Sequence, residues 1–92
     1  MTADEAESVA IQALGWIASD PELAGIFLSA TGADVNDLRK MAGDPVFLGG
    51  VLDFLLQVDS HVTGFCDSVG HPYDTPMRAR AVLPGGEAVN WT

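Results

Sequence analysis

The stretch DPVFLGGVLDFLLQ at residues 44–57 decides the fold. Asp44 can cap a helix, and Pro45 suits the first helical position, where its missing N–H loses no needed hydrogen bond. The residues after Pro45 are apolar on nearly every side of such a helix, and a helix of that kind is buried in a domain core. We therefore expect this helix in the middle of an all-α domain, with the other helices packed around it.

Start and stop signals predict further helices and so a compact bundle of about six. The starts are the capping box of Thr2 and Glu5, then Asp20-Pro21, Asp34, Asp59 and Asp74-Thr75-Pro76. The stops are Ser19, Gly32, Gly43, Gly70 and Pro84-Gly85-Gly86. No alternation with the period of a β-strand competes with these signals anywhere in the sequence.

Apolar residues at helical spacing define the expected core. Outside the central helix, the inward positions are Ala6, Val9, Ala10, Ala13, Leu14, Ile17, Leu23, Ile26, Phe27, Ala30, Val35, Leu38, Met41, Ala42, Val62, Phe65, Cys66 and Val69. A chain of 92 residues can form one such core, which we assign to a single helical domain at residues 1–84. Residues 85–92 are expected to form a flexible C-terminal tail that carries Trp91.

The two halves of the chain resemble each other at an offset of 39 residues. When residues 9–42 are laid on residues 48–81, five positions are identical: Asp20/Asp59, Gly25/Gly64, Ser29/Ser68, Arg39/Arg78 and Ala42/Ala81. Two interpretations stay open. Either two similar three-helix units arose by duplication, or amphipathic helices of similar length align by chance.

The composition is strongly acidic, with 13 acidic and 4 basic residues and a net charge of −9. Most of the carboxylates fall at predicted caps or in first helical turns, where the helix dipole favours negative charge. A local structural role therefore explains most of the acidity. The same charge disfavours general nucleic-acid binding, which needs surplus Lys and Arg, and it favours a basic partner surface.

The sequence indicates a soluble cytoplasmic protein. Its start, MTADEAE, lacks the basic region of a secretory signal. Its most apolar segment, residues 46–58, has 13 residues, whereas a membrane helix needs about 20. We therefore predict no membrane contact. The single cysteine, Cys66, excludes an internal disulfide.

The central helix carries one less apolar face, formed by Gly49, Asp53 and Gln57 at a spacing of four residues. Gly49 is followed by Gly50, and glycines inside a helix are unfavourable by roughly 1 kcal/mol each, so their presence indicates close approach of another group. That group is either another helix of the same chain or a protein partner. Gly49, Asp53, Gln57 and Trp91 are accordingly the candidate partner-binding residues.

The four basic residues fall in two predicted helices, Arg39 and Lys40 in the third, Arg78 and Arg80 in the sixth. A basic third helix after a glycine turn is similar to the recognition helix of a helix-turn-helix protein. The alternative is solvated charge near helix C-termini, where the dipole favours cations. Nucleic-acid binding through these four residues is the second functional hypothesis.

One set of side chains could hold a metal ion or perform catalysis, namely His61, Cys66, Asp67 and His71. His61 and Cys66 point in directions roughly 140° apart on a helix, so they do not converge. No spacing typical of zinc ligands occurs. We therefore predict no catalytic residues, no metal and no cofactor.

The chain resembles a family of small bacterial proteins of unknown function from about residue 5 to Pro84. The matching segments are Ala10-Ile11-Gln12-Ala13-Leu14, Asp20-Pro21, Phe27-Leu28, Thr31-Gly32, Leu38-Arg39, Phe47-Leu48 and Val51-Leu52-Asp53-Phe54-Leu55. These motifs are caps, stops and core positions. The resemblance implies an all-helical, bacterial, cytoplasmic protein and brings no catalytic residues with it.

The function expected from these observations is that of a non-enzymatic adaptor or regulator that binds another protein. The alternative is a helix-turn-helix-like nucleic-acid-binding protein. A homodimer also stays open, because a central helix that is apolar all round could complete its core against a second copy.

Overall fold

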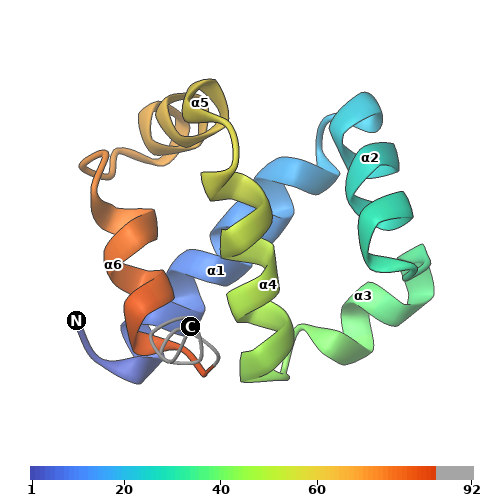
Figure 1. The fold of residues 1–92 in the computed structure, drawn as a ribbon, viewed down its shortest axis with the longest axis horizontal. Coiled ribbons are helices and arrows are strands. Elements are labelled where there is room, and N and C mark those ends of the chain that lie inside the picture. Colours follow the sequence, from blue (N-terminus) through green and yellow to red (C-terminus); the bar gives the residue numbers. More distant parts are fainter. Residues whose placement is uncertain (85–92) are drawn as a thin grey trace, which may run out of the picture.

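The first helix begins at the predicted capping box. The Thr2 hydroxyl accepts a hydrogen bond from the backbone N–H of Glu5 at 3.1 Å, and the Glu5 carboxylate accepts one from the backbone N–H of Thr2 at 2.9 Å. The computed structural model describes residues 1–84, which form six α-helices and no strand. They are α1 (Ala3–Ala18), α2 (Pro21–Thr31), α3 (Val35–Met41), α4 (Pro45–Leu56), α5 (Asp59–Val69) and α6 (Thr75–Val82), as Figure 1 shows. The predicted all-α bundle is confirmed. The predicted tail and Trp91 lie outside the described residues.

The predicted aspartate caps hold for three of the other helices. Asp20 and Asp44 accept backbone hydrogen bonds ahead of Pro21 and Pro45, and Asp34 forms a second capping box with Asp37.

The cap predicted at Asp59 is wrong. Asp59 is the first residue of α5, and the capping position belongs to Val58, which has no side-chain acceptor. Asp74 stands at the capping position of α6 without a side-chain hydrogen bond. Aspartate therefore supplies the capping bonds in the first half of the chain and not in the second.

Two glycine stops are confirmed. Gly32 and Gly70 end α2 and α5 with φ angles of 72° and 78°, in the left-handed region that favours glycine. The third predicted stop, Gly43, is not one. The helix α3 ends at Met41, with Ala42 in right-handed conformation at its cap, and Gly43 has no positive φ.

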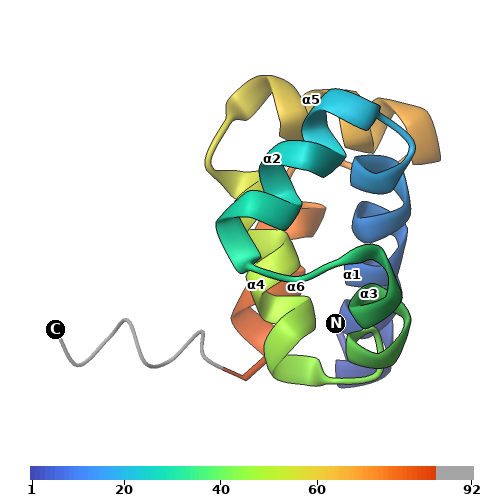
Figure 2. The same ribbon diagram turned by 90° about the vertical axis from the view of Figure 1, so that its right-hand side faces the viewer.

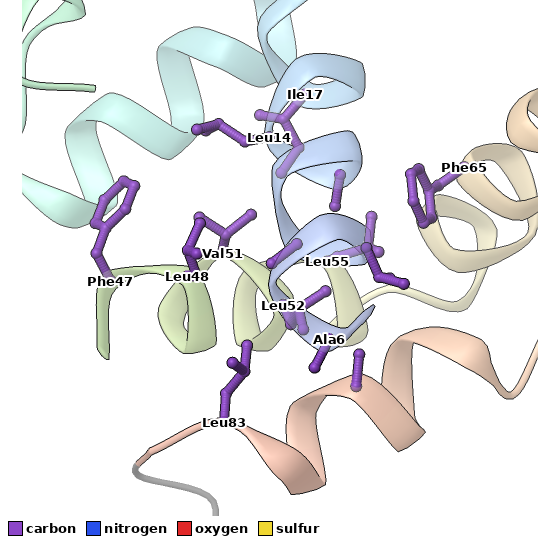
Figure 3. Close-up of a cluster of buried hydrophobic side chains, with 14 of the residues drawn as sticks. Ala6, Leu14, Ile17, Phe47, Leu48, Val51, Leu52, Leu55, Phe65 and Leu83 are labelled. Carbon is purple, nitrogen blue, oxygen red and sulfur yellow. The ribbon is translucent and has the colours of Figure 1, made fainter. Parts of the chain in front are cut away.

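The core lies between α1, α4 and α6, which pack on one another, while α2 flanks α1 and α5 flanks α4 (Figures 1 and 2). Figure 3 shows apolar side chains from these helices meeting in one cluster. Its largest fully buried members include Phe27, Phe65, Ile17, Leu48, Leu52, Leu55 and Leu83. The radius of gyration is 12.3 Å, close to the roughly 12 Å of a compact domain of this length.

Three predicted core residues are on the surface. Ile26 is 53% exposed, Val69 is 39% exposed, and Ala30 is also exposed. The reason is that α2 and α5 are flanking helices, and each packs mainly against one neighbour. Such a helix buries a narrow strip, so α2 buries only Leu23 and Phe27.

The two halves have second helices of equal length but differ in packing. The helices α2 and α5 both have 11 residues and both end in a left-handed glycine. In contrast, α6 packs closely on α1 and α4, whereas α3 has no comparable contact with any helix. Duplication therefore stays a prediction that the packing does not require.

Candidate functional site

The less apolar face of α4 is covered by Arg80 of α6. Its Nε donates to Oδ1 of Asp53 at 2.5 Å, and its Nη1 donates to the carbonyl oxygens of Leu83 at 3.4 Å and Pro84 at 3.3 Å. The guanidinium therefore links the face to the end of the described chain.

Gly49 lies buried beneath this guanidinium. A Cβ atom at Gly49 would lie 3.1 Å from Arg80 Nη1 and 3.1 Å from the carbonyl oxygen of Pro84. The close approach predicted at this glycine is thus made by the chain itself. Gly50 is exposed, and a Cβ there would meet nothing. Of the candidate partner-binding residues, Asp53 and Gln57 remain on the surface.

The four basic residues do not form one surface. Arg39 and Lys40 are exposed in the last turn of α3, and Arg78 is exposed on α6. The helices α3 and α6 stand on opposite sides of α4 (Figure 1). Since Arg80 is engaged by Asp53, only three cations face solvent freely, in two separate places.

The four residues considered for a metal or catalytic role do not form one cluster, although Cys66, Asp67 and His71 line a common hollow at the end of α5. The imidazole of His61 lies against Trp16, whereas Nε2 of His71 is 2.7 Å from the side-chain oxygen of Gln12. Asp67 accepts a hydrogen bond from Tyr73 at 2.7 Å. Among residues 1–84, no group of three or more His, Cys, Asp or Glu is placed to hold a metal ion.

Cys66 is buried, and its Sγ donates to the carbonyl oxygen of Pro72 at 3.4 Å. Burial raises the pKa of the Cys66 thiol, and the nearby charges of Asp67 and Asp74 raise it further. A thiol held in its protonated form is a poor nucleophile. The structure therefore gives Cys66 the role of a small core residue.

An apolar groove between α1 and α3 was missed by the sequence analysis. Its walls are Ile11, Leu14, Gly15 and Ala18 of α1 with Leu38, Arg39 and Ala42 of α3, and its volume is about 340 Å³. Ile11 is 48% exposed, although it is a large aliphatic residue. The signal was present in the sequence, because residues 11, 15 and 18 share one helical face on the side away from the predicted core.

A second hollow, which we call the acidic-aromatic pocket, lies where α1, α2 and α5 meet. It is lined by Trp16, Asp20, Glu22, Leu23, Ile26 and His61 and has a volume of about 240 Å³. Trp16 is partly buried and packs against the core. Its role as a pocket wall depends on Gly64 of α5, where a Cβ atom would come within 3.0 Å of the indole.

These observations define a small all-α protein whose described surface includes an apolar groove and a pocket lined in part by carboxylates. The chain belongs to the family described as "Protein of unknown function (DUF3572)", whose model matches residues 3–86. The expected membership of an uncharacterised family is thus confirmed. No curated protein and no solved structure matches the chain.

No single helix within residues 1–84 is long and apolar enough to cross a membrane. The bent pair α4 and α5 meets the same criteria only when joined, with an angle of 111° between the two helices.

Proposed function

We propose that the protein is a non-enzymatic interaction module that holds an amphipathic helix of a partner protein in the groove between α1 and α3. The observation that carries this proposal is the groove itself, whose walls are almost wholly apolar. Exposed apolar surface of this kind typically marks an interaction site.

The shape of the groove suits a helix. Ile11, Gly15 and Ala18 follow one another at spacings of four and three residues, so they form a line along α1. Gly15 and Ala18 are small and exposed, and a Cβ at Gly15 would meet nothing, so a helix backbone can approach closely there. Leu38 and Ala42 supply the opposite apolar wall from α3. An amphipathic helix would insert its apolar stripe between these walls.

Charge favours a basic partner over a second copy. The face of α1 that carries Ile11 continues toward its N-terminus through Glu7 and Asp4, at spacings of four and seven residues. Two copies of a chain with a net charge of −9 repel each other. A partner helix with basic residues beyond its apolar stripe would pair with Asp4 and Glu7. The nucleic-acid alternative finds no support in three free cations divided between two places.

The test compares partner capture by three exposed variants. Ile11→Glu places a charge in the groove, and Gly15→Leu fills it. Met77→Glu is the matched control, because Met77 is an apolar residue on α6, across α4 from the groove, and is at least as exposed as Ile11. We expect the first two variants to lose a protein that the native chain and Met77→Glu retain in quantitative pull-downs. A photo-crosslinker at position 18 should then label a helical, basic segment of that protein. Equal capture of the partner by all three variants would refute the proposal that the groove is its binding site.

A further inference from the structure

We propose that the acidic-aromatic pocket binds an arginine side chain of a partner protein, at a site separate from the groove. Trp16 supplies its aromatic lining, Leu23 and Ile26 its aliphatic lining, and the exposed residues Asp20 and Glu22 its carboxylates. Its position on α1 differs from that of the groove, because Trp16 points about 140° away from Ile11 around the helix axis.

The aromatic wall is fixed in place. The Trp16 indole meets the imidazole of His61 edge to face, with 6.1 Å between ring centroids, and Phe65 in the same manner at 6.3 Å. Gly64 lies directly against the indole, and no larger residue would fit without displacing it. The ring is therefore held by α5 while it lines the pocket. An aromatic surface that is already ordered loses little conformational entropy when a ligand binds.

The carboxylates of the pocket have capacity for a cation. Oδ1 of Asp20 accepts hydrogen bonds from the backbone N–H groups of Glu22 at 3.0 Å and Leu23 at 3.3 Å, so the cap does not use Oδ2. Across residues 1–84 the one ion pair joins Arg80 to Asp53, so neither Asp20 nor Glu22 is neutralised by a basic side chain there. A guanidinium in the pocket would pair with these two carboxylates.

The residues that line the pocket favour an arginine side chain over a lysine side chain. A planar guanidinium stacks on an indole and also presents a fork of N–H groups to a carboxylate, whereas an ammonium is a strongly hydrated point charge. The exposed surface of Ile26 would cover the aliphatic stem.

The proposal is tested by NMR with a peptide probe, acetyl-Ala-Ala-Arg-Ala-Ala-amide, and its citrulline and lysine counterparts. The chain has two tryptophans, so a Trp91→Phe background leaves Trp16 as the single indole signal. We expect the arginine peptide to shift the indole N–H of Trp16 saturably. Citrulline has the same shape without the charge, and its peptide should leave the signal unchanged. Ile11→Glu should bind the arginine peptide normally, so this test is independent of the groove.

A matched pair of double variants separates the pocket from general charge attraction. Asp20→Ser with Glu22→Gln removes both carboxylates while serine keeps the helix cap. Asp44→Ser with Asp74→Asn removes the same charge at another cap before proline and on another part of the surface. The first variant should weaken peptide binding by about tenfold and the second by less than about twofold. Equal weakening by both variants, equal binding of the citrulline or lysine peptide, or no saturable shift would each overturn the proposal.

Discussion

Arg80 and Asp53 stand 27 residues apart in the chain and meet in an ion pair with 2.5 Å between Nε and Oδ1. The two partners are unequally buried, since the side chain of Arg80 is 14% exposed and that of Asp53 is 54% exposed. The Arg80 guanidinium therefore has less contact with water than the Asp53 carboxylate and relies more on the ion pair to satisfy its charge. It also holds the carbonyl oxygens of Leu83 and Pro84, so a single side chain fixes the end of α6 to the face of α4.

The unequal burial predicts unequal losses of stability. Asp53→Ala should lower the free energy of unfolding by about 1 kcal/mol, because the exposed carboxylate is screened by solvent. Arg80→Ala should cost about 2 kcal/mol, because it also removes the hydrogen bonds to the carbonyls of Leu83 and Pro84 and the packing over Gly49. Urea denaturation measures both values. The double variant should cost little more than Arg80→Ala, and fully additive losses would show that the pair is not coupled.

The neighbouring glycines of α4 are predicted to respond oppositely to alanine. Gly50→Ala should raise the free energy of unfolding by about 0.5–1 kcal/mol, since alanine is the better helix former and nothing lies near its Cβ. Gly49→Ala should lose that gain and destabilise the protein, because the carbonyl oxygen of Pro84 is backbone and cannot easily move from 3.1 Å. Thermal unfolding of the two variants side by side checks the contrast, and equal melting temperatures would contradict it.

Tyr73 is the only tyrosine, so its ionisation can be followed by ultraviolet absorbance. Its hydrogen bond to Asp67 and the charge of that carboxylate raise the pKa of the Tyr73 phenol above its ordinary value of 10.0. The associated stabilisation is present below the ordinary pKa and is lost as pH rises through the raised one. An alkaline titration should therefore give a raised value, which Asp67→Asn returns toward 10.0. An unchanged titration in that variant would rule out the effect of Asp67.

The pKa of the Glu5 carboxyl is predicted to be lowered, whereas that of the Tyr73 phenol is raised. Its hydrogen bonds with the backbone and hydroxyl of Thr2 lower the pKa of the Glu5 carboxyl below 4.5. The capping box therefore stabilises α1 above that ordinary pKa, and this contribution disappears as pH falls through the lowered value. Carbon-13 NMR of the carboxyl group measures the pKa directly. Thr2→Ala removes the hydroxyl but keeps the backbone N–H of residue 2, so it should raise the Glu5 pKa only part of the way toward 4.5. A Glu5 pKa that does not change in this variant would show that the hydroxyl contributes nothing to the shift.

The sequence predicted those parts of the structure that depend on local chemistry. The capping box of Thr2, the stops at Gly32 and Gly70 and the central place of α4 each follow from neighbouring residues or from helical periodicity. It failed at Ile26, because periodicity shows an apolar face but not whether a second helix covers it.

The candidate sites needed the tertiary structure. The sequence placed Asp53 in a partner-binding face and Arg80 in a nucleic-acid surface, and nothing in their spacing indicated that they pair with each other. The glycine at position 49 did predict that another group approaches α4 closely, and in the structure that group is the side chain of Arg80. The groove and the acidic-aromatic pocket each combine residues from helices that only the packing brings together.

The packing of α6 against α1 has a consequence for biosynthesis. The first and last described helices, α1 and α6, pack against each other. The core is therefore incomplete while only residues 1–70 have left the ribosome, because α6 is still missing. Until α6 follows, the faces of α1 and α4 that it covers stay open to other apolar surfaces in the cell. Native structure is thus acquired late in translation, by closure of one long loop instead of helix-by-helix growth.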